Sequence, residues 1–459
     1  MDSTLVKSTL AAAVLMVIAT ALAVAAPTVF PTGTTLYEPG KTWNGYTVLS
    51  ILDTPKAVVI DMNGRVVKEW DDFNVSAGGP ARVLPGGVVI ATSGANPPHQ
   101  EALALVARDF EGRELWRFDH NVQINTPEGA KVWSARVHHD WQRADFPAGY
   151  YSPAYTPQAT GGTTLLLTHI ETRNDAVAPI ALEDDRLIEV DADGLLTWEW
   201  KISDHLDALR LDTGARAAIR SGAAGARGTF DALHINSATF VGPNHWFDAG
   251  DARFAPENVI ISSRQASFIA IVARDGKVVW QIGPDFSRTP EEQAIGQIIG
   301  QHHAHLIPKG LPGAGNLLVF DNGGSSGYGT PTSIAPRGQG IYARATSRVL
   351  EIDPVTLAVK WSYTSANFYS TNISSAQRLP NGNTLITEGA PGRVFEVTPE
   401  KQIVWEYMNP PSKFGRGSNA VYRAYRIPYD WIPRVPKPQE KAVRAPPAGE
   451  FVLPTTETK

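Results

Sequence analysis

The chain has 459 residues, 19% of them charged, and a formal net charge of −5 at pH 7. So small a charge, without any run of lysine or arginine, argues against a general nucleic-acid binder. The absence of cysteine excludes disulfides, thiolate metal sites and cysteine nucleophiles. With 43% hydrophobic residues, 40 Gly and 34 Pro, the composition is that of a globular protein with many short strands between turns.

The N-terminus has the layout of a secretory signal peptide, predicted to span residues 1–25. Lys7 precedes an apolar run that begins at Leu10, and Ala21, Ala23 and Ala25 have the small-residue spacing of a cleavage site. We expect cleavage after Ala25, since the run is short for a bilayer-spanning helix of about 20 residues. An uncleaved membrane anchor is the alternative. In both cases the body of the protein lies outside the cytoplasm, and cleavage would make it a periplasmic or secreted protein without stable membrane association.

Six copies of one β-hairpin pattern recur along the chain. Residues 187–200, LIEVDADGLLTWEW, show it most clearly: alternating apolar residues, an Asp-x-Asp-Gly turn, and a second alternating run that ends in Trp. Period-2 patterning on both sides of a glycine-containing turn predicts a β-hairpin. The other copies are residues 58–70, 105–116, 269–280, 349–361 and 394–405.

A second phrase of strand, turn and strand accompanies these hairpins. It is clearest at residues 376–387 and recurs at 81–92 and, with a longer turn, at 304–320. One hairpin of each kind gives about four strands, the content of one propeller blade. The sequence therefore predicts an all-β fold, a six-bladed β-propeller. The longest insertions follow Trp200 and Trp280, so we expect elaborated loops on one face.

The predicted propeller spans residues 27–435. The strand-like residues 421–428 are expected to close the ring by joining the first blade. Residues 436–459, rich in Pro, Lys and Glu, are predicted to be a disordered C-terminal tail. Within the insertions, helix is expected at residues 204–218 and 290–299.

Histidines gather at one position of the second phrase. The phrase can be aligned on a small or polar residue, namely Ala81, Asp140, Asn236, Ala304 and Ala376. Two residues before these lie Gly79, His138, His234, His302 and Ser374. A lone histidine in a strand is usually structural, whereas three at one repeat position indicate a site. Because the inner strands of a propeller face its central channel, His138, His234 and His302 are predicted to converge at one mouth of that channel as catalytic residues.

Neighbouring side chains are expected to bind substrate. His139 and His303 directly follow two of the predicted catalytic histidines. Asn236, in an Asp-x-x-His-x-Asn pattern, could orient a ring or donate to an anion. Arg264 lies just past a predicted strand and is a candidate for bidentate contact with an anion. A surface salt bridge is the alternative role for Arg264.

Several phrases that span the predicted mature chain are specific in combination: PTGTTLY, NGYTVLS, DALHINS with IISSR, QHHAHLIPKG with LLVFDNG, and SAQRLPNGNTLITEG. In this combination the chain resembles the arylsulfate sulfotransferase family of secreted bacterial six-bladed propellers. Better-known members also carry an N-terminal β-sandwich, for which the lead here is too short. The resemblance implies an enzyme that moves a sulfuryl group from an aryl sulfate to a phenol through a sulfated histidine. It implies no cofactor and no nucleotide donor such as PAPS.

The resemblance also implies roles for individual residues. His234 of DALHINS and His302 of QHHAH match two active-site histidines of the family. Two positions depart from the family pattern, because its arginine beyond FDNG falls near Ser326 and its sulfate-accepting histidine falls on Ser374. Sulfuryl transfer spreads charge over equatorial oxygens, which cations stabilise, and imidazoles can act as nucleophile and base.

For such a transfer we expect Arg264 and His234 to hold the anion, while His302 or His138 activates the phenol or replaces the nucleophile. Two other functions stay open. The three histidines His138, His234 and His302 could hold a divalent metal ion for a lyase or hydrolase. A non-catalytic propeller that binds an anionic or aromatic ligand is the third possibility. The oligomeric state is not predicted.

Overall fold

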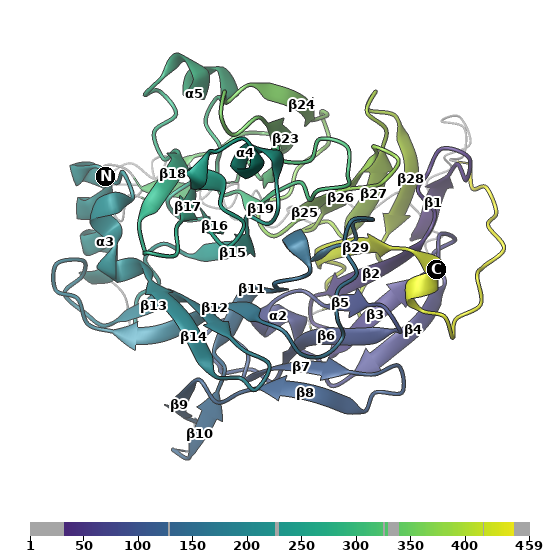
Figure 1. The fold of residues 1–459 in the computed structure, drawn as a ribbon, viewed down its shortest axis with the longest axis horizontal. Coiled ribbons are helices and arrows are strands. Elements are labelled where there is room, and N and C mark those ends of the chain that lie inside the picture. The colour runs from purple at the N-terminus through teal and green to yellow at the C-terminus, as the bar shows by residue number, and fades with distance from the viewer. Residues whose placement is uncertain are drawn as a thin grey trace, which may run out of the picture. The chain divides into compact units, whose positions relative to one another are not determined.

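The computed structural model describes residues 32–444 except 127–128, 225–228, 325, 329–338 and 416. Its principal sheets follow one another around a common centre as the blades of a six-bladed β-propeller (Figure 1). The predicted fold class is therefore confirmed. The predicted signal peptide, residues 1–25, lies outside the described residues. None of the described helices has the length and apolar character needed to cross a membrane.

The first three blades have four strands each, innermost strand first. The first blade consists of β29 (Val421–Ile427), β2 (Tyr46–Ile51), β3 (Lys56–Ile60) and β4 (Val66–Asp71). The second consists of β5 (Arg82–Leu84), β6 (Val88–Ser93), β7 (Ala104–Arg108) and β8 (Glu114–Phe118). The third consists of β11 (Val137–Arg143), β12 (Thr164–Thr172), β13 (Leu182–Val190) and β14 (Leu196–Lys201).

The remaining blades follow in chain order. The fourth consists of β15 (Ile235–Phe240), β16 (Val259–Ser263), β17 (Phe268–Val272) and β18 (Val278–Ile282). The fifth consists of β19 (His302–Leu306), β20 (Leu317–Asp321), β23 (Arg348–Ile352) and β24 (Val359–Tyr363). The sixth consists of β25 (Ser375–Arg378), β26 (Thr384–Glu388), β27 (Arg393–Val397) and β28 (Ile403–Met408), with β1 (Gly33–Tyr37) added at its outer edge.

Shorter elements occupy the connections. Two small hairpins are formed by β9 (Val122–Asn125) with β10 (Lys131–Ser134), and by β21 (Ser326–Tyr328) with β22 (Gln339–Tyr342). The α-helices are α2 (Val75–Gly78), α3 (Thr213–Ala224), α4 (His245–Asp248) and α5 (Pro290–Ile295). The 3-10 turns are η1 (Pro147–Gly149), η2 (Ile202–Asp204), η3 (Leu206–Ala208), η4 (Ala252–Phe254) and η5 (Tyr429–Trp431). Helix is thus present in both predicted insertions, although α3 begins later and α5 ends earlier than expected.

The six Trp-terminated hairpins are the third and fourth strands of the six blades, as the repeat predicts. In each blade, a Trp indole on the outermost strand donates a hydrogen bond of 2.8 to 3.1 Å to a backbone carbonyl in the hairpin turn of the next blade. The last of these bonds, from Trp405 to Met62, joins the sixth blade to the first. The recurring Trp therefore fastens every blade to its neighbour.

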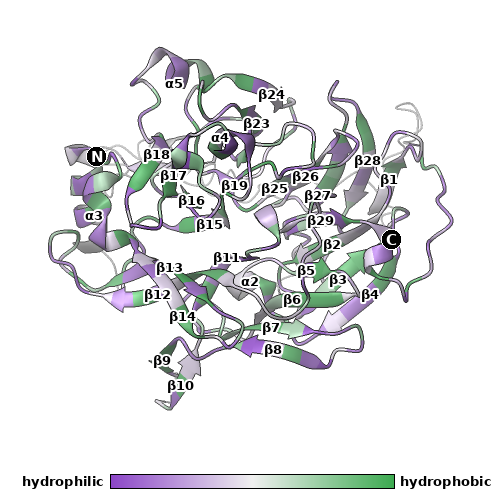
Figure 2. Ribbon diagram, viewed as in Figure 1, coloured by the Kyte–Doolittle hydropathy of each residue, from purple (hydrophilic) through white to green (hydrophobic). Residues whose placement is uncertain are grey.

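Apolar side chains fill the space between the blades. In one cluster Tyr46 and Val59 of the first blade pack with Val89 and Leu105 of the second, all fully buried. Much of β3 and β6 accordingly has the green of apolar residues in Figure 2. Burial of this kind, at roughly 25 cal/mol per Å² of apolar surface, is the main stabilising contribution to the fold.

The ring closes with strands from both ends of the described chain. β29 pairs with β2 from Ile427 opposite Tyr46 to Val421 opposite Ile51, which is the closure predicted for residues 421–428 (Figure 1). β1 pairs with β28 as an additional outer strand. Two separate ladders therefore hold the first and sixth blades in place.

The segment that follows β29 is also held at its start. Tyr37 and Val443 exchange two backbone hydrogen bonds of 2.7 and 3.0 Å, and Asn63 donates to the carbonyl of Lys441. A disordered tail is the prediction from residue 436, and residues 436–444 make these contacts in the structure. Val443 pairs with Tyr37 of the edge strand β1 and occupies its outward backbone groups. Residues 445–459 lie outside the described residues.

A buried ion network links three inner strands at the centre of the propeller. Asp140 on β11 accepts hydrogen bonds of 2.8 Å from Arg82 on β5 and 2.9 Å from Arg423 on β29. Each of the three side chains is at most 1% exposed. The network joins the second, third and first blades, so it includes the closing strand. Removing one member would leave uncompensated buried charge.

We predict that Asp140→Asn lowers the free energy of unfolding by about 3–5 kcal/mol, because two buried guanidinium groups lose their carboxylate. The matched control is Glu69→Gln, which removes a carboxylate paired with Lys56 at 3.0 Å but 41% exposed. That change should cost about 1 kcal/mol or less. Chemical denaturation measures both, and equal small effects would contradict a stabilising role for the central network.

The neighbouring channel histidine, His305, is held uncharged. Its Nδ1 lies 2.9 Å from the carbonyl of His303, and its Nε2 lies 3.0 Å from the hydroxyl of Tyr150. Burial lowers the pKa of His305 from its usual 6.5 to about 4. In the unfolded chain the same side chain takes up a proton near pH 6.5. The contribution of neutral His305 to stability is therefore full above pH 6.5 and declines as the pH falls towards 4.

We predict that stability falls as the pH is lowered from 6.5 to 4, with His305 alone contributing roughly 3 kcal/mol to the fall. In His305→Gln the free energy of unfolding should fall less between pH 6.5 and 4, because one fewer side chain takes up a proton on unfolding. His120→Gln, at a side chain 71% exposed, is the control and should leave the slope unchanged. Melting temperatures measured between pH 7 and 4 test this, and identical slopes in wild type and His305→Gln would refute it.

Candidate functional site

Irregular pairing at the start of three inner strands shapes the candidate site. The register shifts between Val137 and Trp141 in β11, between Ile235 and Ser237 in β15, and between His302 and His305 in β19. At these places His139, His234 and His303 have φ angles of 56°, 50° and 53°. Positive φ is uncommon outside glycine, and β-bulges often re-aim side chains beside active sites.

The bulges also displace the repeat alignment, by one residue in the third blade and by two in the fourth. The ladders place Trp141 and Ala238, rather than Asp140 and Asn236, level with Ala376. Two residues before Trp141 and Ala238 lie His139 and Asn236, so His138 and His234 do not share the repeat position of His302. The sequence pattern showed the gathering of histidines but could not show the extra residue, because a bulge changes the count along one strand only.

A histidine–carboxylate pair forms where the fourth blade begins. The carboxylate of Asp231 accepts a bond of 2.9 Å from the backbone N–H of His234 and a short one from its Nδ1. Burial raises the pKa of Asp231, but the attraction of His234 outweighs burial and lowers it. With its proton on Nδ1, His234 carries a lone pair on Nε2. No hydrogen bond within the described residues uses this Nε2, and the side chain is 25% exposed.

His139 borders this pair from the third blade. Its ring meets that of His234 edge to face, with centroids 4.6 Å apart, and its Nδ1 lies 2.8 Å from Nδ1 of His138. Tyr422 fixes the backbone here by donating to the His139 carbonyl at 2.7 Å. Burial lowers the pKa of His139 far below its usual value, and the nearby His234 lowers it further. His139 is therefore neutral and 6% exposed.

Arg264 supplies a cation beside His234. Its backbone N–H donates to the His234 carbonyl at 3.0 Å, and Ser326 donates to the carbonyl of Arg264. Its guanidinium reaches only Gln265, at 3.4 Å, and no described carboxylate lies within ion-pair distance. Burial lowers the pKa of Arg264, while Asp231 opposes that change. The surface salt bridge considered from the sequence is absent among the described residues, which leaves the cation free for an anion.

His302 has no free nitrogen in this structure. Its Nδ1 donates to the side chain of Asn322 at 2.7 Å, and its Nε2 accepts from the backbone N–H of Ile373 at 3.1 Å. The side chain is 2% exposed. His302 thus ties the fifth blade to the segment before β25. Ser374, where the family nucleophile was expected, is likewise engaged, because its Oγ accepts from Gly389 and donates to Ser370.

Two predicted binding residues lie deeper in the channel. Asn236 donates to the carbonyl of Gln301 at 2.7 Å, and His303 bonds to the carbonyl of Ala376 at 3.0 Å. Both are fully buried. They connect neighbouring blades and are not brought to the His234 site. Likewise, the histidines 138, 234 and 302 do not form a metal-ligand set in the described residues, since none of the groups with suitable spacing contains His234 or His302.

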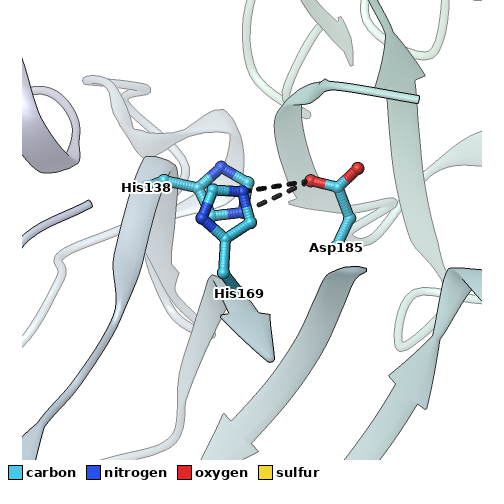
Figure 3. Close-up of side chains that lie close together, drawn as sticks. All are labelled: His138, His169 and Asp185. Atoms are coloured by element: carbon cyan, nitrogen blue, oxygen red, sulfur yellow. Dashed lines mark ion pairs between the residues drawn. The ribbon is translucent and has the colours of Figure 1, made fainter. Parts of the chain in front are cut away.

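The sequence reasoning missed a second cluster, formed by His138, His169 and Asp185 (Figure 3). His169 on β12 and Asp185 on β13 are directly opposite each other in the ladder. These strands have 9 residues each, against 5 in the corresponding strands of the fourth blade, and the extra length carries the polar residues. The signal in the sequence was that extension, where THIET and LEDDR replace apolar alternation.

Carboxylates on the other side of His169 complete this region. His169 Nδ1 lies 3.1 Å from Glu101 and 3.2 Å from Glu183, and Arg136 donates to Glu101 at 2.8 Å. Burial raises the pKa of Glu101, but hydrogen bonds from His169 and Arg136 outweigh burial and lower it to about 2. Glu101 is therefore an anion that fixes the orientation of the His169 ring.

The fold and the site define a six-bladed propeller with a histidine-rich centre. The family model described as arylsulfotransferase (ASST) matches residues 141–409. The chain belongs to this family, whose substrates are phenols and aryl sulfates. Among curated proteins, no sequence matches this chain.

Solved structures with similar folds are remote. A protein of unknown function from Bacteroides caccae is 11% identical over 84% of this chain and 99% of its own, with a TM-score of 0.43. Saccharomyces cerevisiae Sqt1 is 6% identical over 86% and 99%, with a TM-score of 0.39. A streptogramin B lyase is 12% identical over 84% and 85%, with a TM-score of 0.34. At these scores the likenesses carry no functional argument.

Proposed function

We propose that the protein is an aryl-sulfate sulfotransferase in which His234 accepts the sulfuryl group. One observation carries this proposal: His234 combines a carboxylate at Nδ1, a lone pair on Nε2, partial exposure and an unpaired arginine beside it. An imidazole oriented by a carboxylate is a recurrent nucleophile or base in enzymes. Membership of the arylsulfotransferase family supports the substrate class, small phenols and their sulfate esters.

In the first step, the lone pair of His234 Nε2 attacks the sulfur of an aryl sulfate. A nitrogen–sulfur bond forms as the bond from sulfur to the aryl oxygen breaks, and the aryl oxide leaves with the electron pair. The imidazole becomes positively charged, and the carboxylate of Asp231 stabilises that charge through Nδ1–H. The dyad thus makes the sulfated histidine an accessible intermediate.

In the second step, the oxygen of the acceptor phenol attacks the same sulfur. The new oxygen–sulfur bond forms as the nitrogen–sulfur bond breaks, and the electron pair returns to His234 Nε2. The phenol proton goes to the released aryl oxide through solvent. One phenol has replaced another on the sulfuryl group, and no nucleotide or external reductant is needed. No second nucleophile is required, which fits Ser374 being engaged elsewhere.

Charge on the transferring group is stabilised by Arg264 and His139. The three equatorial oxygens of the sulfuryl group carry negative charge throughout the transfer, as in phosphoryl transfer. Arg264 presents a planar guanidinium that suits bidentate contact with such oxygens. His139 presents its ring beside His234. His138 and His302, expected from the sequence to act chemically, support neighbouring groups in this scheme.

The three-histidine metal site for a lyase or hydrolase is not favoured, because His302 is fully engaged and His234 is held by Asp231. The apolar leader supports a further part of the proposal, that the enzyme acts in the periplasm or after secretion.

We predict that His234→Asn lowers turnover of 4-nitrophenyl sulfate with phenol by at least about 10³-fold, because the nucleophile is lost. Asp231→Asn should lower kcat by roughly 10²–10⁴-fold, since the proton on Nδ1 is no longer fixed. His245→Asn, an exposed histidine on α4, is the control and should keep wild-type rates. Turnover of His234→Asn within tenfold of wild type would refute the proposal.

We predict that Arg264→Gln lowers kcat/KM by roughly 10²–10³-fold through loss of charge stabilisation in the transition state. Arg264→Lys should restore only part of this loss, because lysine cannot make the bidentate contact. The matched control is Arg253→Gln, whose guanidinium is paired with Asp251 at 2.6 Å and lies 42% exposed. If Arg264→Gln stays within threefold of wild type in kcat/KM, then Arg264 does not bind the sulfuryl group.

A further inference from the structure

Three adjacent strands of the third blade bring two imidazoles and a carboxylate together. His138 comes from β11, His169 from β12 and Asp185 from β13, and their ligand atoms all lie within 4.8 Å of one another. The two rings stack with centroids 3.6 Å apart, and both face the same oxygen of Asp185 (Figure 3). All three side chains are at most 3% exposed.

The atoms that converge here have no hydrogen-bond partner. Nε2 of His138, Nε2 of His169 and Oδ1 of Asp185 are each buried and unpaired. Buried polar atoms are nearly always paired, since an unpaired one costs about 1–3 kcal/mol. Three such atoms close together indicate a group that all three would bind.

The surroundings of His169 favour a proton on its Nδ1. This atom lies 3.1 Å from Glu101 and 3.2 Å from Glu183, and a ring with its single proton on Nδ1 has a lone pair on Nε2. That lone pair faces Asp185 Oδ1 at 3.8 Å, and Nε2 of His138 faces the same oxygen at 3.3 Å. A charge-assisted N–H···O bond would be about 2.7–2.9 Å long. With the protons of both imidazoles on Nδ1, the three atoms meet as acceptors, which a cation between them would satisfy.

We propose that His138, His169 and Asp185 bind a divalent transition-metal ion of the Zn²⁺ type. Zinc bonds to imidazole nitrogen and carboxylate oxygen are about 2.0–2.2 Å long, so tetrahedral ligand atoms lie about 3.4 Å apart. The two measured nitrogen–oxygen separations, 3.3 and 3.8 Å, bracket that value. Two nitrogens and one oxygen suit zinc and its neighbours better than calcium, which takes six to eight oxygens.

The surroundings are those of a metal ligand shell. Histidines that bind metals usually donate their other N–H to a carboxylate, as His169 does to Glu101. The other oxygen of Asp185 accepts from the backbone N–H of Ile235 at 3.1 Å, which fixes the carboxylate. Burial raises the pKa of Asp185 most, and the nearby carboxylates of Asp231, Asp184 and Glu183 raise it further.

The second acidic group around His169 lacks these features. Glu101, His169 and Glu183 also have ligand atoms within 4.8 Å. However, Glu101 already accepts from Arg136 and Asn96, and Glu183 lies 2.9 Å from His99 Nδ1. Their oxygens have donors, so no cation is needed there.

A metal on His138 would also set the proton on His139. Neutral His138 bound through Nε2 keeps its proton on Nδ1, from which it donates to Nδ1 of His139 at 2.8 Å. His139 then carries its own proton on Nε2. If the proposed sulfuryl transfer is correct, this proton is a hydrogen-bond donor for the sulfuryl oxygens. The ion therefore positions a donor, whereas the transfer itself occurs at His234; its binding does not depend on that transfer.

The test uses the full mature chain, freed of any affinity tag and of metal by a chelator, and then titrated with Zn²⁺ or Co²⁺. We expect one ion per chain by mass spectrometry of the metal content, a raised melting temperature, and the visible absorption of four-coordinate Co²⁺. Ca²⁺ should not compete. All measurements are made without substrate, so a failure of the sulfotransferase proposal would leave them unaffected.

The decisive variant is Asp185→Asn, which keeps the shape, removes an unpaired buried charge and should fold as well as metal-free wild type. Its affinity for Zn²⁺ should fall at least about 100-fold. The control is Asp184→Asn, whose carboxylate is bound by Ser203 at 2.6 Å, and it should bind the ion normally. The proposal is overturned if wild type binds no ion, if Asp185→Asn binds with wild-type affinity, or if only Glu183→Gln loses the ion.

Discussion

Ring closure is the constraint on which the rest of this structure depends. Each blade donates an indole hydrogen bond to the next, and the cycle is complete only because the bond from Trp405 reaches Met62. The closing strand β29 adds a ladder with β2 and carries Arg423 into the central network with Asp140. The positions of the inner strands are therefore fixed from the outside by tryptophans and from the inside by buried charge, which lets those strands carry irregular and polar residues.

The residues of the candidate site lie where the regular strand pairing of the repeat is interrupted. The pairing is irregular at the start of two inner strands, where His139 lies within the irregular stretch of β11 and His234 lies directly before that of β15, both with positive φ. Such strain is tolerated because both flanking blades are held by closure. The result is a gradient of exposure, from buried His138 and His139 to partly exposed His234, with Arg264 at its side. The partly exposed side chains are thus placed to meet a substrate, and the buried ones hold them in position.

The fold was largely predictable from the sequence, because a period-2 pattern ending in Trp specifies a hairpin wherever it occurs. The closing role of residues 421–427 followed from the same count. The site was only partly predictable. The repeat pattern pointed to His234 and a strand end pointed to Arg264, but the engagement of both nitrogens of His302 depends on Asn322 and Ile373, which are distant in sequence. His169 and Asp185 were not predicted as a pair. They lie opposite each other only because of the register between β12 and β13, and no local sequence motif marks that register.

In the proposed mechanism the sulfuryl group passes through His234. The most direct test is to mix the protein with excess 4-nitrophenyl sulfate without an acceptor, quench within one turnover, and locate any added SO₃ group by peptide mass spectrometry. Transfer through His234 predicts one labelled site per chain, on His234, and loss of the label when phenol is added before quenching. A label on another residue, or full turnover without any labelled protein, would contradict it.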